Sequence, residues 1–326
     1  MSWHFVIPPA FAEEVAALPD RVLGQDYPYW LGGRFNWVAQ SYLVLRQYRE
    51  GLTLGMAPEP DRINFAHCMG WRAMGARRGE FRISVRADYP RLFDVDFEIL
   101  QNPAVPLGPR QAYLPYWPVP GVIPRDPSRQ GLKVLAYAGR IGPLNLADDL
   151  KGGPTGLPRG LEFRIIPPHL WHDLSQIDAL IAIRTFDGAP HDAKPPSKLF
   201  SAWRAGIPLI AGGDSAFSAV GTPGHDYLRV RTREEFTDAL QRLHDDPDFY
   251  ARIADNGHAR ADEVSHEAFA RDWIAVFDDR IAPRFEAWKQ DRLKGLYALA
   301  ARGADRGRDT ASGLKSRLRS LSRRPT

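Results

Sequence analysis

Short apolar segments recur along the chain in two series, and this pattern restricts the fold more than any other feature. The first series lies at residues 3–7, 52–56, 63–66, 81–85 and 97–100. The second lies at residues 132–137, 163–166, 179–183, 208–211 and 227–230. Segments of this length are typical of buried strands, and stretches with helical spacing separate several of them. The pattern predicts βαβ units, and therefore parallel sheets with helices on both faces.

Three stretches between these segments carry helix signals. Residues 33–49 have apolar side chains at helical spacing, and residues 197–205 are followed by Gly206. Residues 232–244 begin with a threonine that has a glutamate three positions later, the pattern of a capping box. Glycine commonly ends helices because it adopts the left-handed conformation. We expect a helix at each place, with Ser197 as the N-cap of the second.

A proline-rich stretch separates the two series. Residues 114–127 (LPYWPVPGVIPRDP) cannot form a long regular element, so we expect them to connect two domains. The length of 326 residues fits two domains of roughly 100–200 residues each. The predicted fold is α/β. It has a Rossmann-like domain at residues 1–118 and a second at residues 119–275, facing each other across a cleft, then a C-terminal helix and basic tail at residues 276–326.

Composition indicates a cytoplasmic protein with an ordinary core. Hydrophobic residues make up 44% and charged residues 25% of the chain, and no apolar run reaches the roughly 18 residues of a membrane span. The N-terminus lacks the basic start and continuous apolar segment of a signal peptide. The single cysteine, Cys68, cannot form an internal disulfide, as expected in a reducing compartment.

The net charge of +4 is distributed unevenly. Residues 280–326 contain 13 Lys+Arg and 4 Asp+Glu, so the body of the protein is acidic. Residues 312–322 place leucines on one stripe of a helix with basic residues around it, a pattern typical of a helix on an anionic membrane surface. A solvated, disordered tail is the alternative. We do not expect a nucleic-acid partner, because the basic excess is confined to the tail.

Basic residues follow the predicted strands of the second half. Arg140 and Arg184 each come just after a strand, and Lys194 and Lys198 flank the start of the helix at residues 197–205. A glycine-rich loop at residues 212–217 follows the next strand. Ligands of open parallel sheets bind at the carboxyl ends of strands, and helix N-termini attract anions. We therefore predict a phosphate or diphosphate site, although lysines near a helix start are also often only solvated.

The segment "KPPSKLFSAWRAGIPLIAGGDSAF" resembles the donor-binding segment of GT-B glycosyltransferases of a bacterial family 1/4-like group. "YAGR" is similar to the V-G-R that ends the first strand of their C-terminal domain. "PYWPVPGVIPRDP" resembles their interdomain linker, and "WHDLSQIDALIAIRTFD" a segment of the domain that follows. The resemblance extends over most of residues 83–277 and is specific in the second half.

The resemblance implies roles for particular residues. Arg140 and Lys198 would contact the diphosphate of a sugar nucleotide. Asp214 would lie near the donor sugar hydroxyls, and Ser215 and Ala216 would offer backbone N–H groups to the phosphates. The remaining residues that we expect at the donor site are Gly33, Arg184, Lys194 and Ser197. Gly33, with Gly32, would resemble the glycine loop through which the N-terminal domain approaches the phosphates.

One departure from the family pattern concerns two glutamates. Retaining members carry them seven or eight positions apart, where this chain has Ala193 or Lys194 and Ser201. The second glutamate typically holds the nucleotide ribose, so the nucleotide, and retention or inversion of the sugar configuration, stay open. An inverting enzyme needs a general base, for which His67 and Asp88 are candidates because each follows a predicted strand. A structural role for either is the alternative.

The sequence predicts no metal site and no cofactor beyond the nucleotide sugar as co-substrate. Asp94 and Asp96 form a D-x-D that leads into a strand rather than ending one, and His169 and His172 lack an obvious third ligand. The predicted function is metal-independent sugar transfer to an unknown acceptor, which could be a glycan or lipid-linked. The alternatives are a non-catalytic nucleotide- or glycan-binding protein and a sugar-nucleotide epimerase on the same scaffold.

Overall fold

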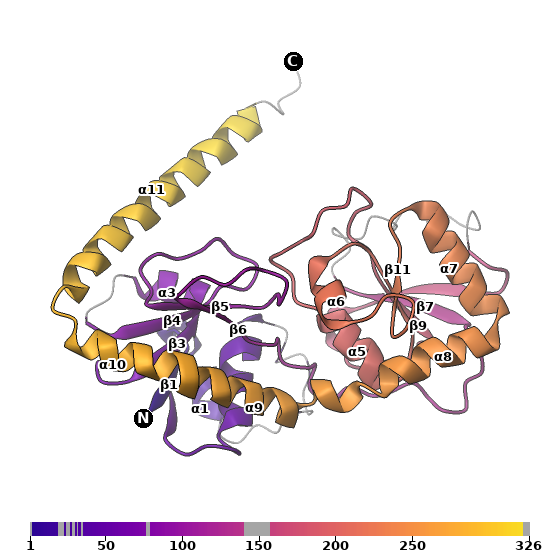
Figure 1. The fold of residues 1–326 in the computed structure, drawn as a ribbon, viewed down its shortest axis with the longest axis horizontal. Helices are drawn as coiled ribbons and strands as arrows, with labels where there is room; N and C mark the ends of the chain where they lie inside the picture. Colours follow the sequence, from indigo (N-terminus) through magenta and orange to yellow (C-terminus); the bar gives the residue numbers. More distant parts are fainter. Residues whose placement is uncertain are drawn as a thin grey trace.

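The computed structural model of the chain describes residues 2–18, 23, 27, 30, 32–33, 35–75, 79–139 and 157–321, without the side chains of residues 296 and 311–321. Its strands form two separate sheets in two lobes that lie side by side (Figure 1). The pairing is parallel throughout both sheets as described. The predicted α/β class with two Rossmann-like domains, the GT-B architecture, is confirmed.

The N-terminal sheet, as far as the structure describes it, has the strand order β2-β1-β3-β4-β5-β6. Its strands are β1 (Trp3–Val6), β2 (Leu52–Gly55), β3 (Ile63–His67), β4 (Phe81–Val85), β5 (Phe97–Leu100) and β6 (Gln111–Tyr113). Four of them, β1, β3, β4 and β5, are buried along their whole length, because helices cover both faces of the sheet.

The C-terminal sheet has the order β11-β10-β9-β7-β8 within the described residues. Its strands are β7 (Val134–Ala138), β8 (Glu162–Ile166), β9 (Ala179–Ala182), β10 (Leu209–Ala211) and β11 (Leu228–Arg229). Strand β8 lies on one side of β7, and the next strand along the chain, β9, lies on the other side of β7. The order therefore reverses between β7 and β9, the point where open α/β sheets bind ligands.

Within the described residues, helical elements separate some of these strands, and a run of helices follows β11. They are η1 (Pro9–Phe11), α1 (Ala12–Ala17), η4 (Phe35–Ala39), α2 (Gln40–Leu45), α3 (Cys68–Met74), η5 (Pro168–Leu170), α5 (Ser197–Ala205), α6 (Ser215–Val220), α7 (Arg233–Asp245), α8 (Pro247–His258), η6 (Ala261–Val264), α9 (His266–Val276), η7 (Phe277–Ile281), α10 (Ala282–Gln290) and α11 (Lys294–Leu321). The ten predicted strands all occur, with ends that differ by at most two residues. The predicted helix at residues 33–49 is instead a π-helical turn, η4, followed by the short α2.

Local sequence signals account for where α5 and α7 begin and end. The Thr232 side chain accepts a hydrogen bond from the Glu235 amide, which confirms the predicted cap of α7. Gly206 adopts the left-handed conformation with φ of 66° and ends α5 as expected. The prediction that Ser197 caps α5 is wrong. Pro196 occupies the N-cap position, and its carbonyl accepts from the amides of Leu199 and Phe200.

The linker at residues 114–127 is bound to both lobes. On the N-terminal side, the Trp117 indole donates to Ser41 Oγ at 2.7 Å, and the Gln40 amide donates to the Pro118 carbonyl at 3.0 Å. On the C-terminal side, Arg204 donates to the Val119 carbonyl at 3.2 Å. The linker is therefore a fixed connection rather than a loose tether.

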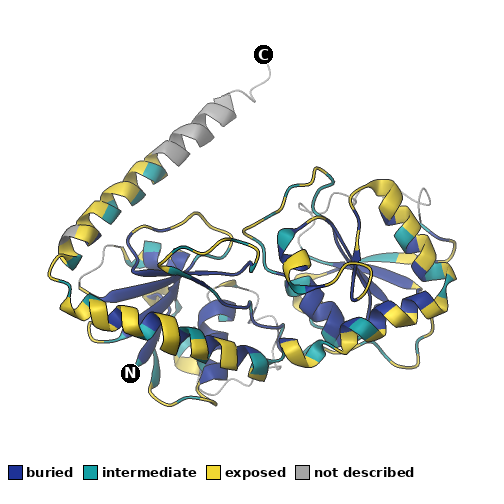
Figure 2. Cartoon of the chain, viewed as in Figure 1, coloured by how far each residue is buried: buried dark blue, intermediate teal, exposed yellow. Residues whose placement is uncertain are grey.

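Helix α9 returns the chain to the N-terminal lobe, and α10 follows it along that lobe (Figures 1 and 2). Trp273 of α9 is fully buried, with its ring centroid 5.0 Å from Trp117, 5.3 Å from Phe65 and 5.9 Å from Trp37. One turn earlier, Phe269 packs against Trp117 of the linker. The continuous helical run from His266 to Gln290 thus belongs to the N-terminal lobe, and the predicted boundary at 275/276 falls inside it.

The last helix, α11, projects beyond the body of the protein (Figure 1). Its middle is attached to the loop before β5, where Asp305 accepts hydrogen bonds from the amides of Phe93 and Asp94. Residues 312–321 are helical as part of α11, and their side chains lie outside those described. Among the described residues, no helix has both the length and the apolar character that crossing a bilayer requires.

The packing of Trp273 predicts a large effect of its removal. Trp273→Ala should lower the free energy of unfolding by about 3–5 kcal/mol, because the cavity would open between the linker and the N-terminal sheet. Urea denaturation followed by circular dichroism measures this change. Arg271→Ala, which removes an exposed side chain of the same helix, should change stability by no more than about 0.5 kcal/mol. Similar losses of unfolding free energy in both variants would contradict the packing role of Trp273 between the linker and the N-terminal sheet.

Candidate functional site

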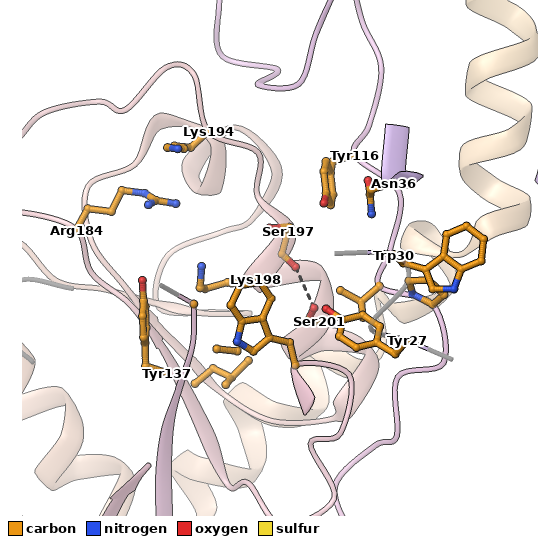
Figure 3. A pocket seen from close by; sticks show the side chains of 16 residues that line it. Tyr27, Trp30, Asn36, Tyr116, Tyr137, Arg184, Lys194, Ser197, Lys198 and Ser201 are labelled. Carbon is orange, nitrogen blue, oxygen red and sulfur yellow. Dashed lines mark hydrogen bonds between the residues drawn. The ribbon is translucent and has the colours of Figure 1, made fainter. Parts of the chain in front are cut away.

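A cavity of about 240 Å³ lies between the lobes, at the carboxyl ends of β7 and β9 (Figure 3). Its walls come from both lobes and from the linker. The lining residues are Tyr27, Trp30, Asn36, Tyr116, Val119, Pro120, Tyr137, Ala138, Gly139, Trp171, Leu180, Arg184, Lys194, Ser197, Lys198 and Ser201. The cavity therefore occupies the place where the strand order of the C-terminal sheet reverses.

Lys198 is a half-buried cation that lines this cavity. It stands in the first turn of α5, and its Nζ lies 5.4 Å from the centre of the Tyr137 ring. Loss of hydration, together with the nearby charges of Arg184 and Lys194, lowers the pKa of Lys198 to about 8. A lysine held in this way stabilises an anion more effectively than a lysine in bulk water, because little water competes for it.

Arg184 extends from the end of β9 towards the same space (Figure 3). Its Nε donates to Asp214 Oδ2 at 2.8 Å. Asp214 is only 1% exposed and does not line the cavity. The carboxylate lies behind Arg184 and orients its guanidinium, and the contact of Asp214 with donor sugar hydroxyls stays a prediction.

Lys194 lines the cavity and also bridges the lobes. Its Nζ lies 2.5 Å from Asp88 Oδ2, which belongs to the loop after β4. Gln101, beyond the end of β5, donates to both Asp88 and the Ala193 carbonyl. Asp88, a predicted base, is thus engaged in a polar connection between the lobes.

Aromatic side chains form the rest of the wall, and sequence analysis did not identify them. They are Tyr27, Trp30, Tyr116, Tyr137 and Trp171. Burial raises the pKa of Tyr27 and Tyr116, so both stay neutral hydrogen-bonding groups. Two local signals were present: Tyr116 lies in the proline-rich linker, and Tyr137 ends a strand. A Cβ at Gly139 would lie only 2.6 Å from the Tyr137 ring, so glycine is required beside that tyrosine.

The first turn of α5 completes the floor of the cavity. Ser201 donates to the Ser197 carbonyl at 3.1 Å, the bond drawn in Figure 3. Both serines line the cavity, so the prediction for Ser197 holds in position, although it is not the N-cap. The helix has no acidic residue in its first turn, and Lys198 is there instead. This end of the helix therefore combines amide dipoles with a fixed cation.

Gly33 and His67 lie together in the N-terminal lobe, outside the residues that line the cavity. A Cβ at Gly33 would lie 3.0 Å from His67 Nε2, so the glycine allows a close approach. His67 Nδ1 accepts from the Met69 amide at 3.2 Å, which places the proton of the neutral ring on Nε2. In this tautomer neither ring nitrogen has a lone pair left to take the proton from a hydroxyl of the sugar acceptor. The structure therefore gives no support to His67 as the general base.

Ser215 and Ala216 at the start of α6 also lie outside the cavity wall. The Ser215 amide donates to the Pro190 carbonyl at 2.8 Å, and its hydroxyl is bonded to Asn102 and Asp192. The Ser215 amide thus has a partner within the protein, and its binding to phosphate stays a prediction. Arg140, the other predicted diphosphate ligand, lies outside the described residues.

The arrangement suits an anion attached to a ring system. Lys198, Arg184 and Lys194 supply positive charge, and aromatic rings and the small polar groups of Asn36 and the serines line the same cavity. Of the carboxylates near these cations, Asp88 and Asp214 are each paired with one of them. Within the described residues no group of three or more His, Cys, Asp or Glu side chains could hold a metal ion.

Residues 173–275 match the family model described as "Glycosyl transferase-like". This segment contains Arg184, Lys194, Ser197, Lys198 and Ser201 of the cavity. No curated protein matches the chain.

Solved structures with a similar chain course share little sequence with this chain. TarM has a TM-score of 0.49 and 9% identity, over 73% of this chain and 58% of that one. HepE from Anabaena, in complex with UDP, has a TM-score of 0.48 and 11% identity, over 61% and 72%. Sucrose-phosphate synthase from Thermosynechococcus elongatus has a TM-score of 0.45 and 14% identity, over 68% and 74%. The chain spans 58% of the length of TarM.

The lowered pKa of Lys198 predicts a pH-dependent anion site. Sulfate keeps its charge above about pH 7, whereas Lys198 loses its own as the pH rises through about 8. Sulfate affinity should therefore fall between about pH 7 and pH 9, as measured by the change in tryptophan fluorescence, to which Trp30 and Trp171 of the cavity contribute.

Two variants test whether Lys198 is the group whose charge sets the pH dependence of sulfate binding. Lys198→Ala should bind sulfate about tenfold or more weakly at pH 7. Lys198→Arg should remove the pH dependence, because a guanidinium stays charged in this range. An unchanged pH profile in Lys198→Arg would assign the titration to another group.

Proposed function

We propose that the chain is a glycosyltransferase that moves a sugar from a nucleotide-diphosphate donor to an acceptor. The observation that supports this most directly is the cavity between the lobes, where Lys198 and Arg184 stand at a helix N-terminus and a strand end. The match to the glycosyl transferase-like family covers the same segment.

The geometry suggests how the cations act. Negative charge develops on the diphosphate as the bond to the sugar breaks. Positive groups fixed at that point stabilise the transition state more than the ground state, which accelerates the reaction. The Arg184 guanidinium is oriented by Asp214 before the ligand arrives, so little reorganisation is needed. Arg140, which follows β7 in the sequence, is proposed to add a further cation.

The aromatic wall is proposed to receive the nucleoside part of the donor. Aromatic rings bind flat rings by stacking, and Tyr and Trp add a hydrogen-bonding group at one end. Ser201 stands where the family has a ribose-binding glutamate, and its hydroxyl is used by the Ser197 carbonyl. The ribose is therefore held by neutral groups of this cavity, such as Asn36.

Transfer assays test this proposal. Full-length protein is incubated with UDP-, GDP- and ADP-sugars, and released nucleotide diphosphate is measured with and without EDTA. Turnover of at least one donor is expected, unaffected by EDTA. Lys198→Ala and Arg140→Ala should each lower kcat about 10²–10³-fold without loss of folding. Lys289→Ala, a surface lysine on α10, should leave it unchanged.

The other outcomes separate the alternatives. Binding of a nucleotide sugar without any release or transfer would identify a non-catalytic binding protein. Recovery of a nucleotide sugar with an altered configuration would identify an epimerase. Full activity of Lys198→Ala would remove the cavity from the mechanism.

We also propose that the C-terminal end of α11 attaches the protein to an anionic membrane surface. Residues 312–324 carry Lys315, Arg317, Arg319, Arg323 and Arg324 beside three leucines. Each cation near anionic lipid adds about 1 kcal/mol, so the segment is strong enough for peripheral attachment. This would place the enzyme close to lipid-linked or envelope acceptors.

Liposome co-sedimentation tests the attachment. The full chain should bind vesicles that contain about one third anionic lipid, with binding that weakens at high salt. A version that ends at Thr310 keeps the Asp305 and Asp309 contacts to the body and should not bind. Equal binding of both versions would refute the role of the tail.

A further inference from the structure

A second groove lies on the N-terminal lobe, far along the sheet from the cavity between the lobes. It has a volume of about 470 Å³ and lies between the edge formed by β5 and β6 and the first half of α11. It shares no lining residue with the cavity. The groove is at the starts of these strands, whereas the contacts to the other lobe come from Gln101 and Asn102 beyond the end of β5.

The wall that α11 contributes is fixed in place. Asp305 binds two backbone amides of the loop before β5, and Arg302 lies 3.8 Å from Asp94. Ala300, Ala301 and Ala304 face the groove. Their small side chains leave space between the helix and the sheet, so the groove belongs to the folded protein and is not a gap beside a loose tail.

Glu98 of β5 is the unusual residue of this groove. It is only 2% exposed, and Oε2 accepts from the Gln111 amide at 2.6 Å, with Arg91 Nε at 3.9 Å. The other oxygen, Oε1, is buried and has no hydrogen-bond partner within the described residues. Burial raises the pKa of this carboxyl group. An unpaired buried oxygen is costly, which favours a ligand that supplies a donor.

The charges around Glu98 define the kind of ligand. Arg91 and Arg110 line the groove together with two carboxylates, Glu98 and Asp96. The balance of positive and negative groups selects neither a cation nor an anion. It suits a neutral molecule with several hydroxyl groups, which donate to carboxylate oxygens and accept from guanidinium and amide groups.

An aromatic side chain stands at the same groove. Tyr297 of α11 is 57% exposed although it is large and mostly apolar. An exposed tyrosine beside a carboxylate, an amide and two arginines offers an apolar surface for the C–H face of a sugar ring, with polar groups for its hydroxyls.

We propose that this groove binds one sugar unit of a glycan, with hydroxyls on Glu98 and the arginines and the ring against Tyr297. The binding itself is independent of the chemistry in the cavity. Its use as a holding site for a glycan acceptor rests on the proposed transferase function.

Saturation-transfer NMR with the full chain tests the groove. The probes are the methyl glycosides of glucose, galactose, mannose and N-acetylglucosamine. At least one should bind, and both Glu98→Gln and Tyr297→Ala should weaken it about fivefold or more, since each removes one contact of the sugar. Tyr48→Ala, which removes an exposed tyrosine elsewhere on the lobe, should bind as the unmodified chain does.

Two results would overturn the proposal: no probe binds, or the Tyr297→Ala and Glu98→Gln proteins bind as well as the unmodified chain. Tyr297 is exposed, so its removal tests the groove even if the Glu98 variant fails to fold. Lys198→Ala separates this proposal from the function of the cavity. It should lower the rate of sugar transfer about 10²–10³-fold while methyl glycoside binding persists.

Discussion

The packing of α9 against the linker is the contact on which the rest of the structure depends. Trp273 and Phe269 meet Trp117, and Phe269 in turn packs against Phe200 of α5 at 5.4 Å. One helix thereby joins the core of the N-terminal lobe to the helix that carries Lys198. Because apolar packing is dense and resists shear, this contact sets the spacing of the two lobes and with it the width of the cavity.

The cavity concentrates positive charge where water is scarce, and this has an energetic cost that the structure offsets only in part. Asp214 pairs with Arg184 and Asp88 pairs with Lys194, whereas Lys198 lies against the Tyr137 ring. The pKa of Lys198 is lowered first by its loss of hydration and then by the like charges of Arg184 and Lys194. A bound anion offsets the repulsion between these cations. The arrangement that lowers the stability of the empty protein therefore raises its affinity for an anion.

Most of the fold was predictable from the sequence, because strands and helices follow from local patterns. The strands at residues 81–85 and 97–100 and the helix at residues 197–205 occur as predicted. The site was predictable only in part. Lys194, Lys198 and Arg184 do line one cavity, since strand ends of a parallel sheet share an edge. The roles expected for Asp214 and the Ser215 amide stay predictions, since each group has a partner within the protein.

The sequence by itself determined the two parallel sheets, the helix that carries Lys198 and the sheet edge where basic residues collect. The spacing of apolar residues and the signals that begin and end helices act over only a few residues. Tertiary structure alone decided that α9 returns to the first lobe, that Tyr27 and Trp30 line the same cavity as Lys198, and that Asp214 lies behind Arg184. These contacts join residues far apart in the chain, and packing and burial select among many pairings that local patterns leave equally open.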